Sequence, residues 1–264
     1  MSATIGYAPT NPATPYFVDP AVDLLPAHGA IRRDLAEQLG GPVGERILDA
    51  GCGTGEDVVE LAALAGPEGP AVLGIDIDPR MVEESRLRSG DCGLSVEFRQ
   101  ADVCAMDFAD GEFDGVRAKE LLSECSDPDA AAAQLVRVTR PGGRIAVFEY
   151  DLDTVAVDHP DPMLTRRIVA ECSEAIGHRW DGRRLAGRFL DLGTTGVTVT
   201  PHTVIMHPEH FRNWLGARLA RARRSGALSM TQEQLTGWWE PLESAAGRDR
   251  FFAAVTGFAV GATC

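Results

Sequence analysis

The sequence predicts an α/β protein built on a doubly wound, mostly parallel sheet. Between Arg46 and Tyr150, short β-like runs alternate with helix-like runs, an order that requires right-handed crossovers and places helices on both faces of the sheet. A glycine-rich stretch at 51–55 follows the first β-like run, and ligands of such sheets bind at the carboxyl ends of the strands. At 264 residues, 44% of them hydrophobic, the chain is long enough to bury one large domain with a cap.

The segment from 46 to 151 supplies the core of this sheet. Gly66 and Pro67 stop its first helix, Pro79 lies near the start of the second, and Asp127 caps the third. The predicted strands are 46–50, 71–77, 94–102, 113–118 and 144–150, and the predicted helices between them are 56–66, 79–90 and 127–143.

The rest of the chain is predicted to cap the core and to extend its sheet. We expect an amphipathic helix at 27–40 and the segment 150–190 to cover the ligand site. Further predicted helices are 161–177, 211–223 and 231–245, and further strands are 195–206 and 250–262. The expected division is an N-terminal arm and cap helix at 1–45, a ligand-binding core at 46–151, and lid helices with strands completing the same sheet at 152–264.

Charge and composition exclude several kinds of partner. The net charge is -14 and the isoelectric point is about 4.8, so nucleic-acid backbones and anionic membranes would repel the chain. The basic cluster at 218, 221, 223 and 224 has helical spacing and is expected to be a solvated helix face. No apolar run approaches the roughly 18 residues of a membrane span, and the N-terminus lacks the pattern of a signal peptide.

Cysteine and histidine spacing favours a reduced, cytoplasmic protein without a bound metal. The six cysteines include no C-x-x-C pair, so a zinc knuckle or a thioredoxin-like site is not expected. His207 and His210 form an H-x-x-H pair, but no third ligand is apparent, and the start of a helix explains the pair as well.

The glycine stretch reads G-x-G-x-G rather than the G-x-G-x-x-G of dinucleotide-binding loops. Glu56 stands where the third glycine of that fingerprint belongs. A carboxylate suits a helix N-terminus but would repel a pyrophosphate bound there. No Lys-Ser or Lys-Thr pair follows, as a Walker loop requires. The loop is therefore expected to hold a ligand that approaches its backbone and is not a polyphosphate.

Acidic residues end the next two strands. Asp76 can accept hydrogen bonds from the vicinal hydroxyls of a ribose. Asp102 can accept from an exocyclic amine such as adenine N6, with the Val103 backbone N–H alongside. With the glycine loop, these positions describe an adenosine without phosphates. Turn glycines and solvated carboxylates at strand ends are the alternative interpretation.

Five stretches together carry a family resemblance: LDAGCGTG (48–55), GIDIDPRM (74–81), the Ala-Asp pair at 101–102, FDGVRAKELLSECSDP (113–128) and RVTRPGGRIAVFEYD (137–151). The chain resembles the class I S-adenosylmethionine-dependent methyltransferases, especially the small-molecule branch related to the quinone-biosynthesis methyltransferases. That resemblance implies a seven-stranded Rossmann-like sheet with an α-helical lid, S-adenosyl-L-methionine as cofactor, and S-adenosyl-L-homocysteine as product.

The resemblance also implies a role for each residue of the cofactor site. Asp76 would hold the ribose, Asp49 would order the loop, and Lys119 would lie near the sulfonium through its backbone. Tyr16, in the N-terminal arm, would fold over the cofactor unless the arm is disordered. The remaining implied contacts are Gly51, Gly53 and Thr54 to the methionyl part, and Ile77, Met81, Asp102 and Val103 to adenine.

The acceptor side is expected at the ends of the fourth and fifth strands. Positioning supplies much of the rate of methyl transfer, and a base helps when the acceptor is a hydroxyl or a protonated amine. Similar proteins often carry Gln-His where this chain has Ser-Glu at 123–124, so Glu124 is a candidate base or partner of a cationic acceptor, unless it faces solvent. The other candidates are Tyr150 and His178 for catalysis, and Glu149 and Trp180 for the acceptor, with strand-end capping and core packing as their alternative roles.

The leading functional hypothesis is transfer of a methyl group from S-adenosyl-L-methionine to an O, N or C atom of a small metabolite, in secondary metabolism, by a monomer or homodimer. An alternative is an enzyme of the same fold and cofactor that runs a cyclisation, decarboxylation or hydroxylation without methyl transfer. A nicotinamide dehydrogenase is disfavoured by Glu56. A binding module that has lost catalysis is the remaining alternative.

Overall fold

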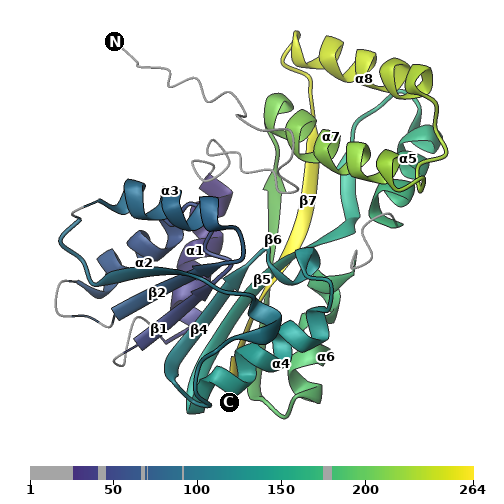
Figure 1. Cartoon of the computed structure of the whole chain (residues 1–264). Helices are drawn as coiled ribbons and strands as arrows, with labels where there is room; N and C mark the ends of the chain where they lie inside the picture. The colour runs from purple at the N-terminus through teal and green to yellow at the C-terminus, as the bar shows by residue number, and fades with distance from the viewer. Residues whose placement is uncertain (1–25, 41–45, 67–68, 70, 91, 175–179) are drawn as a thin grey trace.

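A computed structural model describes the chain except residues 1–25, 41–45, 67–68, 70, 91 and 175–179. Its centre is a seven-stranded sheet with the order β3-β2-β1-β4-β5-β7-β6 (Figure 1). Strands β1 to β5 run parallel to one another, and β7 runs antiparallel to both β5 and β6. The predicted doubly wound, mostly parallel α/β fold is confirmed.

The strand bounds agree with the predicted ones to within three residues except at β5, which is longer than expected. The predicted strand 144–150 is the centre of a strand that pairs with β4 on one side and with β7 on the other. The strands are β1 Arg46–Ala50, β2 Ala71–Asp76, β3 Val96–Gln100, β4 Phe113–Lys119, β5 Thr139–Val157, β6 Thr195–Ile205 and β7 Ala253–Thr263.

The helices connect these strands and cover them. The α-helices are α1 Pro26–Gln38, α2 Glu56–Ala65, α3 Pro79–Ser89, α4 Pro128–Val138, α5 Pro162–Glu174, α6 Asp181–Asp191, α7 Pro208–Arg224 and α8 Gln232–Ala246, and the short 3₁₀ helices are η1 Val103–Ala105 and η2 Leu122–Glu124. Within the described ranges, no helix is long and apolar enough to cross a lipid bilayer.

Helices pack on both faces of the sheet, as the alternating pattern requires. On one face, Leu35 of α1 and Leu61 of α2 share a core with Phe148 of β5. On the other face, Leu135 of α4 and Phe189 of α6 pack on apolar residues of β1, β4 and β5. Neighbouring residues of β5 point to opposite faces, so the strand contributes to both cores.

The strand order predicts where a ligand crevice lies. β1 lies between β2 and β4, so the chain leaves β1 in one direction for β2 and returns on the other side for β4. The helices that follow β1 and β4 therefore depart on opposite sides, and a crevice opens at the carboxyl ends of these strands. The glycine loop, Asp76 and η2 all lie at this edge.

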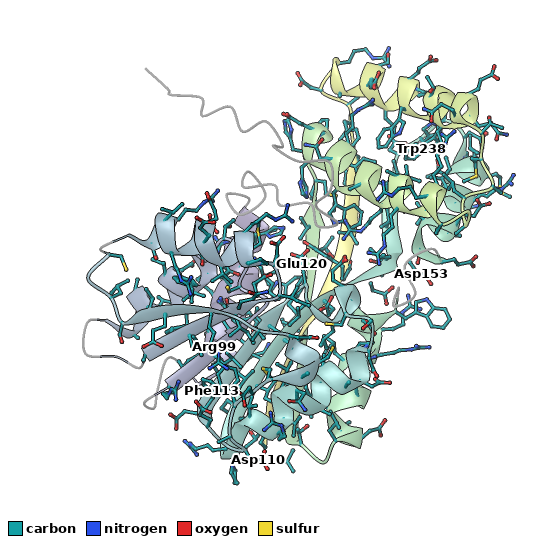
Figure 2. The ribbon with its side chains drawn as sticks, viewed as in Figure 1. Arg99, Asp110, Phe113, Glu120, Asp153 and Trp238 are labelled. Atoms are coloured by element: carbon teal, nitrogen blue, oxygen red, sulfur yellow. The ribbon has the colours of Figure 1, made fainter. Side chains whose placement is uncertain are left out.

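Helices α5, α7 and α8 form a separate layer beyond this end of the sheet (Figure 1). Trp238 of α8 is fully buried in this layer, and its indole N–H donates to Thr165 Oγ1 of α5 at 2.9 Å (Figure 2). Strands β6 and β7 belong to the same sheet as the core. The expected division at residues 45 and 151 remains a prediction.

Helix α6 is not among the helices predicted from the sequence. Gly182 and Gly187 weaken its helical propensity in the sequence. Gly182 is required by packing, because a Cβ there would lie 2.8 Å from the Glu149 carbonyl oxygen of β5. The predicted helix 127–143 is also shorter, because it ends at Val138 and the chain enters β5 directly.

Candidate functional site

The glycine loop is held against the end of β2. The backbone N–H groups of Gly51 and Cys52 both donate to the Ile75 carbonyl, at 2.8 and 2.9 Å. The Gly53 N–H donates to Asp76 Oδ2 at 3.0 Å. The loop therefore takes its shape from β2, and one acidic side chain fixes its middle.

Gly55 and Gly53 of the loop need to be glycine for different reasons. Gly55 has φ 86, and a Cβ there would lie 2.7 Å from Ser85 Cβ and 2.8 Å from the Phe98 ring, so α2 packs on α3 and β3 only with a glycine at its start. Gly53 has φ 52, and no atom lies within 4 Å of the position its Cβ would occupy. The backbone at Gly53 thus faces open space that a ligand can approach.

Asp76 joins the loop to the start of α3. Its Oδ1 accepts from the Asp78 N–H at 2.9 Å, while its Oδ2 accepts from Gly53. Burial raises the pKa of Asp76, and these two hydrogen bonds act against that rise. The next residue, Ile77, is 52% exposed, which is unusual for a large apolar side chain beside a strand end and provides a surface for a planar ring.

Asp102 lies at the end of the neighbouring strand. The Ala101 N–H donates to the Asp76 carbonyl at 3.1 Å, which keeps the chain after β3 beside the end of β2. Asp102 is exposed and caps η1 by accepting from the Cys104 N–H at 2.9 Å. Val103 is buried behind it. The predicted ribose and adenine positions are thus on adjacent strand ends.

A small pocket of about 120 Å³ opens beside the loop. Loop residues 51–54 line it together with Asp49, Asp57 and Lys119. Lys119 Nζ and Asp57 Oδ2 form an ion pair at 2.9 Å in this pocket. Burial opposes ionisation of Asp57, but Lys119 and Arg117 outweigh it and lower the Asp57 pKa to about 2. The pocket therefore offers a cation and a carboxylate side by side.

Arg117 forms the floor beneath this pocket. It is fully buried in β4, and its Nε donates to Asp49 Oδ1 of β1 at 2.8 Å. Its Nη2 lies 3.8 Å from Asp57 Oδ2. Burial raises the Asp49 pKa, and Arg117 counteracts that rise. Sequence reasoning missed both Arg117 and Asp57, although an arginine between the apolar residues Val116 and Ala118 of the strand FDGVRAK was a signal for a buried ion pair.

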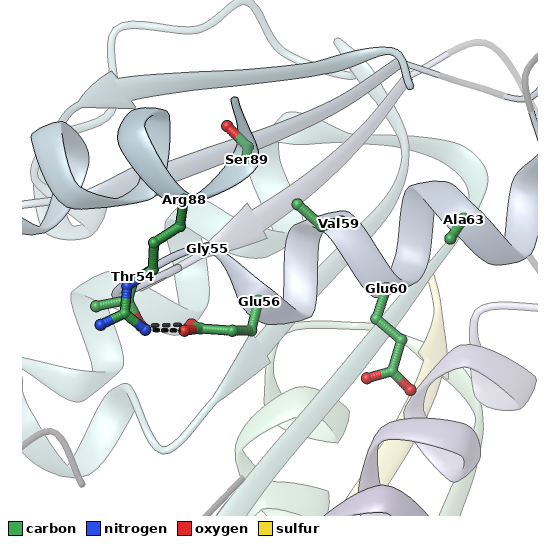
Figure 3. Close-up of a pocket in the computed structure, with 8 residues that line it drawn as sticks. All are labelled: Thr54, Gly55, Glu56, Val59, Glu60, Ala63, Arg88 and Ser89. Carbon is green, nitrogen blue, oxygen red and sulfur yellow. Dashed lines mark hydrogen bonds and ion pairs between the residues drawn. The ribbon is translucent and has the colours of Figure 1, made fainter. Parts of the chain in front are cut away.

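A second, shallower groove of about 290 Å³ lies between α2 and α3 (Figure 3). Thr54 and Glu56 line both hollows, so the groove adjoins the small pocket. Glu56 accepts from the Thr54 hydroxyl and forms an ion pair with Arg88 of α3. The carboxylate at the position of the missing third glycine is therefore turned toward Arg88.

At the acceptor side, two glutamates have partners within the protein. Glu149 is 1% exposed and accepts from the Leu122 N–H at 2.5 Å and the Ser123 hydroxyl at 2.8 Å. Burial raises its pKa to about 8, so the group holds η2 as a largely protonated acid at neutral pH. Glu124 of η2 forms an ion pair with Arg221 of α7 at 3.0 Å, which connects the end of β4 to the helical layer.

Tyr150 points away from Glu149, toward α1 and α7. Its hydroxyl lies 3.1 Å from His28 Nε2, and its ring packs edge-on against Trp214 at 6.1 Å. Burial is the main cause that lowers the His28 pKa to about 3, so this imidazole is neutral. Trp180 lies elsewhere: its N–H donates to Asp153 Oδ2 at 2.5 Å, and its ring contacts the Arg184 guanidinium at 5.0 Å.

The structure brings together most of the predicted cofactor residues. Asp49, Gly51, Gly53, Thr54 and Lys119 line the small pocket, and Asp76 is bonded to Gly53. Met81 lies in the first turn of α3, after Ile77. Tyr16 and His178 lie outside the described residues. The described residues contain no group of three side chains with metal-ligating chemistry.

A family model for a methyltransferase domain matches residues 43–194. The chain belongs to this methyltransferase family. The matched segment begins before β1 and ends before β6, so it contains the glycine loop, Asp76, the small pocket and α6. Helices α7 and α8 lie outside the match.

Two relatives show how much of this chain is shared with other proteins. An uncharacterized 37.1 kDa protein in a transposon of Streptomyces fradiae is 35% identical over 221 residues, which is 82% of this chain and 62% of that protein. The ubiquinone/menaquinone biosynthesis C-methyltransferase UbiE of Bdellovibrio bacteriovorus is 32% identical over 123 residues, which is 47% of this chain and 52% of UbiE. The chain thus spans between half and two thirds of the length of these relatives.

Solved structures share the fold of this methyltransferase at low identity. The YcgJ protein of Bacillus subtilis superimposes with a TM-score of 0.60 at 15% identity, covering 89% of this chain and 99% of YcgJ. Phosphoethanolamine N-methyltransferase 2 of Haemonchus contortus, in complex with S-adenosyl-L-methionine, gives a TM-score of 0.53 at 18% identity, covering 88% of this chain and 51% of that protein. These likenesses confirm the class I methyltransferase fold.

Proposed function

We propose that the chain binds S-adenosyl-L-methionine at the carboxyl ends of β1, β2 and β3 and transfers its methyl group to an O, N or C atom of a small molecule. The observation that carries this proposal is the loop at Gly53, whose backbone faces open space and is fixed by Asp76 beside a pocket. The cofactor supplies an electrophilic methyl group. The protein supplies binding, orientation and exclusion of water.

The charges of the small pocket fit the amino-acid end of this cofactor. That end carries one ammonium and one carboxylate, and the pocket offers Asp57 and Lys119 as a pair 2.9 Å apart. Asp49 sits deeper, held in place by Arg117. The ribose would reach Asp76, and the adenine would lie on Ile77 with Met81, Asp102 and Val103 around it, while Gly51 and Thr54 flank the methionyl chain.

Among the described candidates, Tyr150 is the group we favour for orienting the acceptor. Its hydroxyl can donate to His28 Nε2 in the neutral tautomer that carries its proton on Nδ1. Glu124 remains a candidate base only if its ion pair with Arg221 opens when the acceptor binds. Glu149 acts through η2 in this proposal, because both of its oxygens accept hydrogen bonds there.

The partners follow from the charge and from the family. We propose a small-molecule acceptor from secondary metabolism rather than a nucleic acid, because the net charge is -14. We propose that the protein works in the cytoplasm as a monomer or homodimer, and all six cysteines are free thiols in the structure, as a reducing compartment would keep them.

Incubation with methyl-labelled S-adenosyl-L-methionine and a panel of small phenols, amines and acids tests this function by mass spectrometry. A product heavier by one labelled methyl, formed with S-adenosyl-L-homocysteine, supports the proposal. Turnover of an acceptor with the cofactor unconsumed would favour the non-methylating enzyme instead. Absence of cofactor binding in calorimetry, with binding of reduced nicotinamide, would overturn both.

A further inference from the structure

Helix α7 carries two buried hydrogen-bond donors that no acceptor in the described part of the chain satisfies. Trp214 is 5% exposed, and its indole N–H has no partner among the described residues. Arg218, one turn further on, has a buried Nε–H that likewise lacks one. Indole and guanidinium nitrogens only donate, so both positions require oxygen acceptors. Buried polar groups are nearly always satisfied, and two unsatisfied donors on one helix face suggest a missing ligand.

The two donors belong to one patch. The Arg218 guanidinium carbon lies 4.1 Å from the centre of the Trp214 ring, and Arg218 Nη1 donates to the Trp214 carbonyl at 3.1 Å. Stacking on the indole and this hydrogen bond fix the guanidinium plane, so little ordering remains when a ligand binds. We call Trp214 and Arg218 the α7 donor pair.

The Arg218 guanidinium has no ion-pair partner within the described ranges. Glu124 is in an ion pair with Arg221, and no carboxylate of the described residues forms one with Arg218. Burial lowers the Arg218 pKa, and Glu124 and Glu120 act against that shift without reversing it. Arg117, whose side chain is also buried, has carboxylates beside it.

The α7 donor pair lies beside the proposed site of methyl transfer. Trp214 packs edge-on against Tyr150, which lies in β5 directly after Glu149. Arg221, on the same face of α7 as Arg218, reaches Glu124 of η2 just beyond β4. The pair therefore faces the ends of β4 and β5, where we place the acceptor.

We propose that the methyl acceptor carries an anionic oxygen group, a carboxylate or a phosphate, that Arg218 and Trp214 bind. This inference rests on the proposed function, since it names the acceptor class for that site. An anion supplies both oxygen acceptors for the unsatisfied donors and the missing counter-charge. The net charge of -14 disfavours anions at long range, but an unpaired guanidinium within contact distance outweighs charges beyond the roughly 8 Å screening length.

Binding of small probes to the protein saturated with S-adenosyl-L-homocysteine tests this inference. Benzoate and phenylphosphonate probe the two anion classes, and benzamide is the neutral isostere of benzoate. We expect at least one anion to bind at least tenfold more tightly than benzamide, and Arg218→Met to remove that preference. Arg218→Lys retains part of it, and Trp214→Phe weakens anion binding about two- to fivefold.

Arg212→Met is the matched control, because Arg212 lies on the same helix but pairs with Glu243 at an exposed position. It should leave the anion preference unchanged. Equal affinity of the wild type for all three probes, or an anion preference that survives Arg218→Met, would overturn the inference. If Arg218→Met does not fold, the wild-type comparison of benzoate, phenylphosphonate and benzamide decides by itself. The titrations are repeated without cofactor, so a failure to bind S-adenosyl-L-homocysteine counts against the proposed function alone.

Discussion

The Gly53 N–H donates to Asp76 Oδ2 at 3.0 Å, and this bond joins the glycine loop to the end of β2. The same carboxylate has its other oxygen on the Asp78 N–H. One side chain therefore holds both the glycine loop and the turn before α3, and its remaining lone pairs can still accept hydrogen bonds from a ligand. A defect at this position affects both the shape of the site and its contacts with a ribose.

Replacement of Asp76 should remove cofactor binding. We expect Asp76→Ala to weaken the affinity for S-adenosyl-L-homocysteine by about 100-fold or more, since hydrogen bonds to a charged group contribute about 1.5–3 kcal/mol each. The affinity of Asp76→Asn should lie between those of the wild type and Asp76→Ala, because the amide oxygen can still accept a hydrogen bond from one N–H. Calorimetric titration measures both, with the exposed Asp110→Ala as control. Affinity retained in Asp76→Ala would remove the ribose assignment.

Substitution of Gly55 should affect mainly the stability of the fold, and substitution of Gly53 should affect mainly cofactor binding. Gly55→Ala meets Ser85 and Phe98 and should lower the free energy of unfolding by about 1–3 kcal/mol. Gly53→Ala meets no protein atom, so its main effect should be loss of cofactor affinity, beyond the cost of about 1–2 kcal/mol for its left-handed backbone.

Gly226→Ala controls for that backbone cost, because Gly226 has φ 75 in open space at the end of α7. Urea denaturation and calorimetry measure the three variants side by side. If Gly53→Ala binds S-adenosyl-L-homocysteine with the affinity of the wild type, the cofactor does not lie against the backbone of Gly53.

The buried ion pair under the pocket should be costly to break from one side. Arg117→Met leaves Asp49 buried without its partner and should lower the free energy of unfolding by about 3–5 kcal/mol. The double variant Arg117→Met with Asp49→Asn should recover much of this loss, because no unpaired charge remains on β1. Urea unfolding of the wild type, the two single variants and the double variant gives the coupling free energy between Arg117 and Asp49. Additive effects of the two substitutions would show that the pair is not coupled.

Glu149 should make stability fall as the pH rises. Burial raises its pKa from 4.5 to about 8 in the folded protein, so the folded state holds a proton that the unfolded state loses above pH 4.5. The stabilising contribution is complete below pH 4.5 and is lost as the pH rises toward 8. Glu149→Gln should flatten this dependence and be more stable than the wild type at pH 8. Urea midpoints at several pH values measure it, and parallel curves for the two proteins would contradict this assignment.

The central part of the fold could be predicted because its signals are local. The alternation of apolar runs with helices identified β1 to β4, and Asp127 caps α4 by accepting from the Ala130 N–H as expected. Helix α6 was missed because Gly182 lowers the helical propensity of this segment. The glycine is needed because it packs against β5, which is far away in the sequence. Helical propensity depends on the local sequence, so it cannot indicate that a glycine is needed for packing between distant elements.

The candidate site divides in the same way. Asp76 and the glycines could be predicted because they follow strands whose ends must meet at one edge. The partners of Glu124 and Glu149 could not, since they depend on how η2 meets α7 and β5. The expectation of a solvated arginine face on α7 is wrong for Arg218, because its Nε is buried, whereas Arg223 and Arg224 are exposed.

A crystal structure of the protein grown with S-adenosyl-L-homocysteine tests the central claim most directly. We expect the ribose hydroxyls on Asp76, the amino-acid end of the ligand beside Lys119 and Asp57, and the adenine against Ile77. A complex with the nucleoside bound elsewhere, or with protein side chains filling the space at Gly53, would contradict it.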